Sequence, residues 1–215
     1  MSLFPTSPVS PGQVERSFSR QGITKIIGVD EAGRGALFGP VVAAAVALPE
    51  GHGIVGLADS KQLDPRTRDR LAVQVKERCL AWGIGQAGVE QIATVNILQA
   101  TFVAMRQAVS KVVEAGVNPQ LVLVDGPHAV PDMVLPQKAL VKGDQRSVNI
   151  AAASILAKTY RDDLIVQLAK EYPGYGLQRH KGYGTARHRA ALHDLGLTPL
   201  HRKQFCKNFL DDKHL

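Results

Sequence analysis

Apolar residues recur along this chain at two spacings, which predict two kinds of secondary structure. Apolar runs of a strand's length, alternating or continuous, lie at 23–30, 41–48, 82–89, 121–124 and 139–142. Apolar residues spaced three or four positions apart predict helices at 65–81, 97–112, 147–170 and 185–195. The two early strands predict a hairpin, and helices and strands alternate after them. The pattern therefore predicts an α/β fold with a mixed central sheet flanked by helices, and a helical C-terminal appendage.

The first 22 residues differ in composition from the rest of the chain. They contain Pro5, Pro8, Pro11 and five serines, a composition that indicates a flexible leader. The remaining residues, 23–215, fit a single domain. We expect removal of residues 1–20 to change the melting temperature and the activity very little.

The charge of the chain favours a polyanionic partner. Lys and Arg number 26 against 19 Asp and Glu, a net charge of +7. From residue 178 onward there are eight Lys and Arg against three Asp, so the excess lies in a basic C-terminal region that starts at about residue 172. Such an excess suits nucleic acid, although many basic proteins bind none.

Cysteine content and hydropathy exclude other classes of protein. Cys79 and Cys206 are the only cysteines and have no metal-binding spacing, which favours a reducing, cytoplasmic location. The longest apolar run, 41–48, is far shorter than the roughly 20 residues of a spanning helix, so we expect no membrane partner.

Acidic residues stand where predicted strands end. Asp30 and Glu31 close the first strand, Asp125 closes the fourth, and Asp144 follows the fifth. Carboxylates that converge at strand ends repel one another unless a cation lies between them, and oxygen ligands suit Mg²⁺ or Mn²⁺. Neighbouring strand residues face opposite ways, so Asp30 and Glu31 can share a site only if the strand breaks there. The Ala-Gly-Arg-Gly that follows predicts this break.

Each acid also has a structural interpretation. An Asp after a strand is often a turn residue or a helix cap, and Asp144 precedes a predicted helix. Gly83-x-Gly85-x-x-Gly88 matches a dinucleotide-binding fingerprint, but a helix precedes it and no helix opens from it, so we reject that function. His188 and His193 diverge on a helix, which favours surface or nucleic-acid contacts over a zinc site.

Six motifs in order resemble those of bacterial type 2 ribonuclease H, over roughly residues 26–205. They are DEAGRG at 30–35 with GPVV at 39–42, DSKQL at 59–63, VDG at 124–126, KGD at 142–144, AAASILAK at 151–158 with Arg161-Asp162, and KGY at 181–183. A single one of these motifs is weak evidence, whereas all six in family order are specific.

The resemblance implies an RNase H-like fold and an activity. The activity is endonucleolytic hydrolysis of the RNA strand of RNA/DNA hybrids and cleavage 5′ of ribonucleotides embedded in duplex DNA. Two Mn²⁺ or Mg²⁺ ions would act, leaving 3′-hydroxyl and 5′-phosphate ends. By motif match Asp30, Glu31 and Asp125 become metal ligands and Asp144 the fourth catalytic acid. Asp162 is a second match for the fourth acid, but we prefer to interpret it as an ion-paired residue in the middle of a helix.

The resemblance also assigns substrate contacts. The backbone of Gly33, Arg34 and Gly35 and the side chain of Tyr183 would read the 2′-hydroxyl, since glycine lets a backbone approach a sugar closely. Four basic residues, three of them in the motifs, would contact phosphates: Lys61, Lys158, Lys181 and Arg187. Each is equally consistent with a solvated surface charge.

We expect a monomer. The alternative function is a non-catalytic basic nucleic-acid-binding module, from which metal-dependent cleavage would distinguish the enzyme.

Overall fold

A computed structural model describes residues 12–57, 60 and 63–210. Its strands are β1 (Ile26–Ala32), β2 (Val41–Ala47), β3 (Ala81–Ala87), β4 (Leu121–Asp125) and β5 (Gln137–Leu140). Its helices are α1 (Gln13–Ser19), α2 (Pro65–Arg78), α3 (Val89–Glu114), α4 (Val148–Glu171), α5 (Leu177–His180), α6 (Ala186–Leu195) and α7 (Lys203–Cys206). Two 3₁₀ turns, η1 (Gly143–Gln145) and η2 (Lys207–Phe209), complete the described elements.

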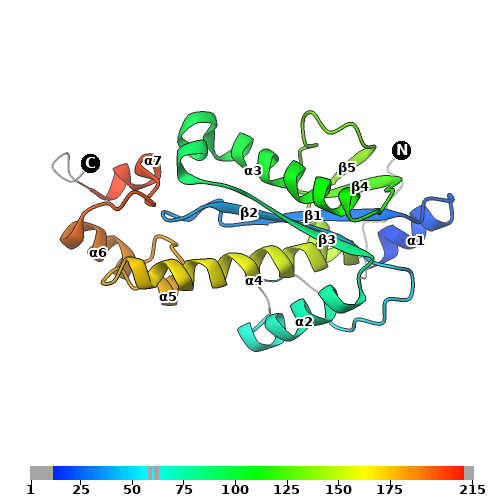
Figure 1. Cartoon of the computed structure of the whole chain (residues 1–215), viewed down its shortest axis with the longest axis horizontal. Helices are drawn as coiled ribbons and strands as arrows, with labels where there is room; N and C mark the ends of the chain where they lie inside the picture. Colours follow the sequence, from blue (N-terminus) through cyan, green and yellow to red (C-terminus); the bar gives the residue numbers. More distant parts are fainter. Residues whose placement is uncertain (1–11, 58–59, 61–62, 211–215) are drawn as a thin grey trace.

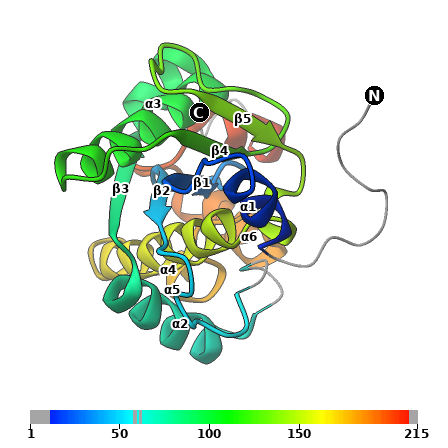
Figure 2. The same ribbon diagram turned by 90° about the vertical axis from the view of Figure 1, so that its right-hand side faces the viewer.

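The strands form one mixed sheet in the order β3-β2-β1-β4-β5. β2 is antiparallel to β1 and β3, whereas β4 is parallel to β1 and β5. α3 covers one face, and α4 covers the other with α2 outside it (Figures 1 and 2). This arrangement confirms the predicted α/β fold with a mixed sheet.

β2 shows why the central strands read as continuous apolar runs. All seven of its residues are buried, because helices cover both faces of the sheet. Val42 and Ala44 pack with α2 and α4, whereas Ala43 and Ala45 pack with α3. The small alanines let both helices come close to the strand.

α4 runs along β1, and two glycines of β1 and the turn after it, Gly28 and Gly33, let the helix approach closely because they have no Cβ. A Cβ on Gly28 would lie 2.1 Å from the carbonyl carbon of Asn149, and a Cβ on Gly33 would lie 1.9 Å from Nε of Arg161. Twelve helical residues rise about 18 Å, and five strand residues span about 17 Å. The helix and the strand therefore stay in step from Gly28 to Gly33, which places Ser154 beside Asp30.

Gly83 and Gly85 have a packing function in β3. A Cβ on either residue would lie 2.3 or 2.0 Å from the carbonyl oxygens of Ala108 and Ala104 in α3. The glycines of the apparent dinucleotide fingerprint thus admit α3 against the edge of the sheet. Gln107 accepts a hydrogen bond from the backbone N–H of Gln86 (3.0 Å), and Lys111 donates one to the carbonyl of Ile84 (2.6 Å). Side chains of α3 therefore occupy part of the open edge of β3.

α3 begins eight residues earlier than the predicted 97–112. It contains a kink at Asn96, whose φ is 68°. The Asn96 side chain accepts hydrogen bonds from the backbone N–H groups of Leu98 and Gln99. Asn96 therefore caps the segment that the apolar spacing predicts.

The described part of the predicted leader contains a helix that packs on the domain. Residues 13–19 form α1, in which Val14 is buried. The Glu15 carboxylate accepts hydrogen bonds from the Ser147 hydroxyl and from the backbone and side-chain nitrogens of Asn149. The prediction was wrong here because the Pro and Ser content is concentrated before residue 12, outside the described residues, and because one acidic side chain fixes α1 to the start of α4.

The C-terminal helices share a core with the loop after β1. Phe38, Ile165, Leu177 and Leu192 are buried together in one cluster, which joins α4, α5 and α6. Among the residues that the structure describes, no helix is long and apolar enough to cross a membrane.

Candidate active site

Two predicted acids lie side by side where β1 and β4 end. Val29 of β1 pairs with Val124 of β4 in the parallel register, and Asp30 and Asp125 each come one residue later. Asp30 is buried, with 5% of its surface exposed, and Asp125 is half-buried. Parallel pairing therefore brings together two carboxylates that are 95 residues apart in sequence.

The position of Glu31 differs from the sequence prediction. β1 does not break after Asp30: Asp30 pairs with Ala44, Glu31 with Ala43 and Ala32 with Val42. Asp30 and Glu31 therefore face opposite sides of the sheet. The predicted break was wrong because β2 continues the ladder past both residues, and the turn starts only at Gly33.

The electrostatics of the site centre on Asp30. Burial raises the pKa of Asp30 well above its usual range, and the nearby carboxylates of Glu31 and Asp125 raise it further. A hydrogen bond from the Ser154 hydroxyl and one from the backbone N–H of Glu31 (2.7 Å) act in the opposite direction. Repulsion among carboxylates at a strand end is the condition that a bound cation relieves.

A glycine brings Asp144 to the same region. The backbone N–H of Gly143 donates a 2.7 Å hydrogen bond to Oδ1 of Asp125, and a Cβ on Gly143 would lie 2.6 Å from the Ile150 side chain. Asp144 follows in η1 and is buried. It is not the cap of α4, because the Ser147 side chain accepts the capping bond from Ile150.

The acidic side chains of the site do not converge on a single metal position in this structure. Among residues 12–57, 60 and 63–210, no group of three or more His, Cys, Asp and Glu side chains is placed to hold a metal ion. Glu31 on the other face of the sheet accounts for part of this, since its carboxylate lies 3.3 Å from Nη1 of Arg34.

A buried polar network connects Asp30 with Lys158. Ser154, which bonds to Asp30, is 2.9 Å from the Ser60 hydroxyl, and the Ser60 carbonyl accepts a bond from Arg68. Arg68 pairs with Asp162 at 3.4 Å, and Asp162 pairs with Lys158 at 2.7 Å. The preferred interpretation of Asp162, an ion-paired residue in the middle of a helix, is confirmed. Lys61, a predicted phosphate contact next to Ser60, lies outside the described residues.

Tyr183 lies at the other end of this network. Lys158 Nζ is 5.2 Å and the Arg161 guanidinium 5.4 Å from the centre of the Tyr183 ring, which is half-buried. Tyr183 also forms an isolated β-bridge with Ala36, just after the Gly-Arg-Gly turn. Fold and packing thus bring the KGY motif beside the DEAGRG motif, 150 residues earlier in the chain.

The two glycines of the Gly-Arg-Gly turn have different surroundings. Gly33 is buried against Arg161 at a φ of 92°, whereas a Cβ on exposed Gly35 would meet nothing within 4 Å. Gly33 is therefore needed for packing, and Gly35 leaves open space at the surface.

Two buried arginines to which the sequence analysis assigned no role hold these turns. Arg161 donates to the carbonyls of Phe38, Pro40 and Lys181, and Arg202 donates to those of Arg34 and Gly39. Their charge gave no signal, because a buried arginine cannot be told from a surface arginine in the sequence.

Two of the predicted phosphate contacts lie at or near the surface. Lys181 is half-buried and donates a 2.6 Å hydrogen bond to the carbonyl of Gln178. Arg187 is exposed.

His188 is buried, contrary to the surface or nucleic-acid contact predicted for it. It has no exposed surface, and its Nε2 lies 3.1 Å from Nε2 of the equally buried His201. Its helix packs one face on the C-terminal core, and His188 lies on that face. His193 is exposed on the other side of α6.

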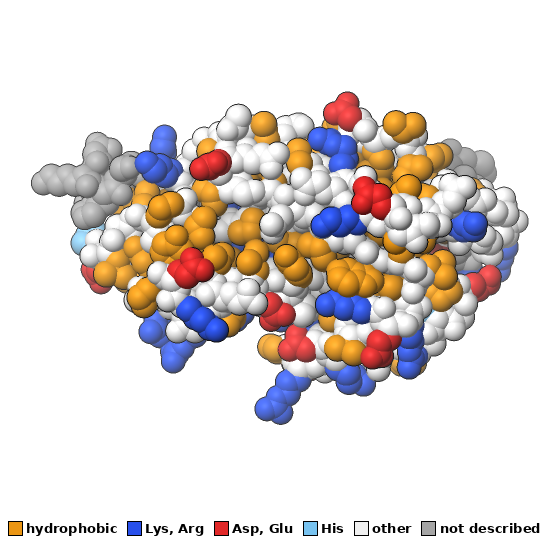
Figure 3. Space-filling view, in the orientation of Figure 1, with side chains coloured by type: hydrophobic (Ala, Val, Ile, Leu, Met, Phe, Trp, Pro, Cys, Tyr) orange, Lys and Arg blue, Asp and Glu red, His pale blue; other side chains and the backbone are white. Residues whose placement is uncertain are grey.

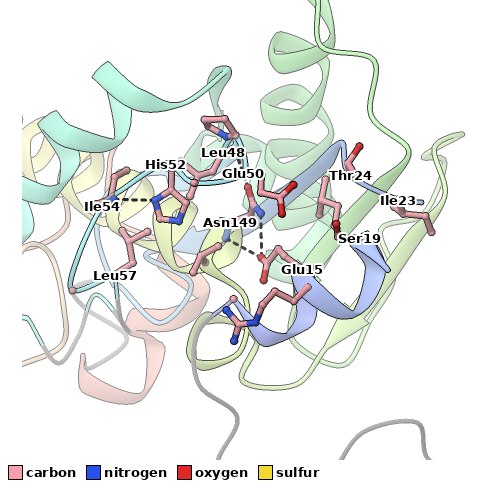
Figure 4. Close-up of a pocket in the computed structure, with 17 residues that line it drawn as sticks. Glu15, Ser19, Ile23, Thr24, Leu48, Glu50, His52, Ile54, Leu57 and Asn149 are labelled. Atoms are coloured by element: carbon pink, nitrogen blue, oxygen red, sulfur yellow. Dashed lines mark hydrogen bonds between the residues drawn. The ribbon is translucent and has the colours of Figure 1, made fainter. Parts of the chain in front are cut away.

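A cavity in the described part of the chain lies away from these residues. It has a volume of about 630 Å³ and is lined by the start of β1 and the segment after β2. Glu15, His52 and Asn149 are among its polar groups (Figure 4). None of the predicted site residues lines it.

The surface charge is mixed on the face that Figure 3 shows. Lys and Arg are interspersed there with acidic side chains rather than gathered into one patch.

Sequence comparison decides between the enzyme and the non-catalytic nucleic-acid-binding module that the sequence analysis left open. The family model for "Ribonuclease HII" matches residues 27–208. The chain belongs to the ribonuclease HII family. It is 48% identical over 205 residues to ribonuclease HII of Syntrophotalea carbinolica, covering 95% of this chain and 96% of that one. It is 51% identical over 191 residues to ribonuclease HII of Moorella thermoacetica, covering 89% and 91% of the two chains.

Solved structures agree with this assignment. Ribonuclease HII of Archaeoglobus fulgidus, in a complex with PCNA, superposes with a TM-score of 0.69 at 25% identity and covers 87% of this chain and 97% of that one. Bst-RNase HIII, solved in complex with Mn²⁺, has the same fold with a TM-score of 0.66 at 24% identity, covering 78% and 60%. The chain is therefore a ribonuclease H, an endonuclease acting on RNA/DNA hybrids, as the sequence motifs predicted.

The two candidates for the fourth acid should differ in what their loss affects. Asp144→Asn should lower the cleavage rate far more than Asp162→Asn when both rates are divided by the folded fraction. Asp162→Asn should instead lower the free energy of unfolding by about 3 kcal/mol, because it breaks a buried ion pair. Cleavage assays and urea denaturation of the two variants measure this. A folded Asp162→Asn enzyme slower than Asp144→Asn would contradict the choice of Asp144.

Acid should destabilise the fold through the buried imidazoles. Burial lowers the pKa of His188 to about 4 and that of His201 to about 3, so both are neutral in the folded protein. Their stabilisation is present above the unfolded pKa of about 6.5. It is lost as the pH falls towards the folded values, by about 2 kcal/mol per histidine at pH 5. The raised pKa of Asp30 has the opposite effect on stability, because it favours the folded protein as the pH falls.

The melting temperatures of the parent and a His188→Asn variant at pH 7.5 and pH 5 separate these effects. The parent should lose more of its melting temperature than the variant does, because Asn cannot take up the proton. An equal decrease in both proteins would show that His188 does not contribute.

Proposed function

We propose that this ribonuclease HII cuts on the 5′ side of a ribonucleotide embedded in duplex DNA as well as within the RNA strand of hybrids. Water would attack the phosphorus, and the bond from phosphorus to the 3′ oxygen of the preceding nucleotide would break. The products would be a 3′-hydroxyl and a 5′-phosphate. The observation that carries the proposal is the juxtaposition of the acids at the ends of β1 and β4 with the network that ends at the Tyr183 ring.

The donor set fits hard divalent cations. Asp30 and Asp125 would hold Mn²⁺ or Mg²⁺, with Asp144 as the fourth catalytic acid, because carboxylate oxygens are the ligands these ions prefer. Glu31 faces the other side of the sheet, but it lies near the end of β1 and its carboxylate acts on Asp30, so it would reach the same ions around the strand end. The raised pKa of Asp30 supports this, since it reflects burial first and then repulsion from the Glu31 and Asp125 carboxylates, and a bound cation would relieve that repulsion. Two such ions, when bound, would stabilise both the attacking and the leaving oxygen.

Residues around Tyr183 would select the sugar. Tyr183 would stack on the ribose, and the backbone at Gly33, Arg34 and Gly35 would contact its 2′-hydroxyl; the open surface at Gly35 supports this role. The Lys158 ammonium is held by Asp162 near the Tyr183 ring, where it would meet a phosphate beside that sugar. Lys181 and Lys61 would provide further phosphate contacts.

A labelled DNA duplex with one ribonucleotide tests the proposal. With Mg²⁺ or Mn²⁺ the enzyme should cut 5′ of the ribonucleotide, and with EDTA it should not. Tyr183→Ala should cut about tenfold more slowly or worse, because a stacked ring contributes about 1–3 kcal/mol. The control is the all-DNA duplex, which should stay intact. Comparable cleavage of all-DNA duplex, or a Tyr183→Ala enzyme as fast as its parent, would overturn the proposal.

A further inference from the structure

The backbone of Tyr183 is the end point of a hydrogen-bonded chain that starts 15 residues later in the sequence. The backbone N–H of Thr198 donates to Nδ1 of His201 at 2.9 Å, and the Thr198 hydroxyl lies 2.8 Å from the same atom. Nε2 of His201 is 3.1 Å from Nε2 of His188, and Nδ1 of His188 is 3.0 Å from the carbonyl oxygen of Tyr183.

These partners fix the protons on both rings. Because His201 Nδ1 accepts from Thr198, the neutral His201 ring carries its proton on Nε2 and donates it to His188. His188 then accepts at Nε2 and donates from Nδ1 to the Tyr183 carbonyl. The chain therefore has one direction, from Thr198 to Tyr183, and it needs both rings to be neutral.

The surroundings of the pair keep it neutral. Both rings are buried, and burial lowers the pKa of each. His180 stacks on His188 at 4.4 Å, and Tyr175 packs on His201 at 5.0 Å. The charged groups nearby are cationic: Lys181 and Arg187 act on His180, and Arg202 adjoins His201 in the chain. A second proton on His188 would place two donors against each other at the Nε2 atoms, and a second proton on His201 would place Nδ1–H against the Thr198 N–H.

The same pair contacts the loop that follows the Gly-Arg-Gly turn. His201 forms a β-bridge with Phe38, and its ring packs on the Phe38 ring at 4.9 Å. The Leu37 N–H donates to the carbonyl of Gly182, beside Tyr183. The imidazole pair is thus connected to both turns that would contact the ribose.

We propose that His188 and His201 are positioning residues, which hold the Tyr183 ring at the distance from the Gly-Arg-Gly turn that sugar recognition needs. The proposal rests on the proposed function, in which Tyr183 stacks on the ribose. His188 acts through the Tyr183 carbonyl and His201 acts through His188, so neither touches the substrate.

A double-mutant cycle on the single-ribonucleotide duplex tests the proposal. His188→Ala should lower the single-turnover cleavage rate about tenfold, as expected for the loss of one hydrogen bond that supports a reacting group. In a Tyr183→Ala background the same change should lower the rate less than twofold, because no ring is left to position. A general packing defect would lower the rate equally in both backgrounds, and that result would overturn the proposal.

Two further variants separate positioning from stability. His188→Asn keeps a donor near the position of Nδ1 and should retain at least a third of the parent rate; an Asn enzyme as slow as the Ala enzyme would contradict the role of this bond. His180→Ala is the matched control, because His180 stacks on His188 but bonds to the Tyr175 carbonyl instead. It should change the rate less than twofold. If Tyr183→Ala alone has no effect, the proposed function and the positioning role that rests on it are both overturned, whereas a slow Tyr183→Ala enzyme with equal His188→Ala losses in both backgrounds overturns the positioning role alone.

Discussion

Asp125→Asn should leave a folded protein that binds RNA/DNA hybrid but cleaves it about two to three orders of magnitude more slowly, an effect of the size seen when one electrostatic stabiliser of a transition state is removed. Asp125 is next to Asp30 across the parallel register, and its carboxylate contributes to the repulsion that would favour a cation. The amide keeps the acceptor that receives the Gly143 N–H but removes the negative charge. Binding should persist because the phosphates meet one negative charge fewer.

Cleavage rates at saturating Mg²⁺ and hybrid affinity in EDTA measure the two effects separately. Asp132→Asn is the matched control, because Asp132 is 86% exposed and pairs only distantly with Arg106, at 3.9 Å. It should cleave at the parent rate. Near-normal turnover by Asp125→Asn would show that Asp125 is not a metal ligand.

The second large effect is on folding. Gly28→Ala should lower the free energy of unfolding by about 3 kcal/mol or more, at the upper end for overpacked cores. The new Cβ would lie 2.1 Å from the carbonyl carbon of Asn149 and 2.2 Å from the amide nitrogen of Ile150. Both are backbone atoms of α4, so no side chain can rotate away, and the helix must move from β1.

Urea denaturation of Gly28→Ala and of a control variant, Gly88→Ala, measures this difference. Gly88 precedes α3, and a Cβ there would meet nothing within 4 Å. We expect a loss of about 1 kcal/mol or less for the control. Equal losses in the two variants would show that α4 does not depend on the close approach at Gly28.

The sequence predicted the fold well where burial is two-sided and periodic. β2 is buried along its whole length, and its apolar run gave its bounds to within a residue. α1 was missed because it is short and depends on one long-range partner, the start of α4 at Ser147. No local pattern reports such a contact.

The geometry of the candidate site could be predicted from the sequence only in part. Strand ends brought Asp30 and Asp125 together as expected, whereas the orientation of Glu31 depended on how far β2 continues the ladder. His188 was misplaced because a helix with few apolar residues does not show which face is buried. Arg161 and Arg202 could be recognised only from the backbone carbonyls they reach, and all of these except that of Lys181 lie more than 120 residues away.

The way α3 covers β3 also affects how this protein behaves at high concentration. An exposed edge strand can recruit a strand from another molecule, and this is a common route to aggregation. Here Gln107 and Lys111 already occupy the Gln86 N–H and the Ile84 carbonyl on the edge strand. At these two positions a second molecule could extend the sheet only by displacing bonds within the first one. The glycines that let α3 approach β3 therefore also help to keep the sheets of separate molecules apart.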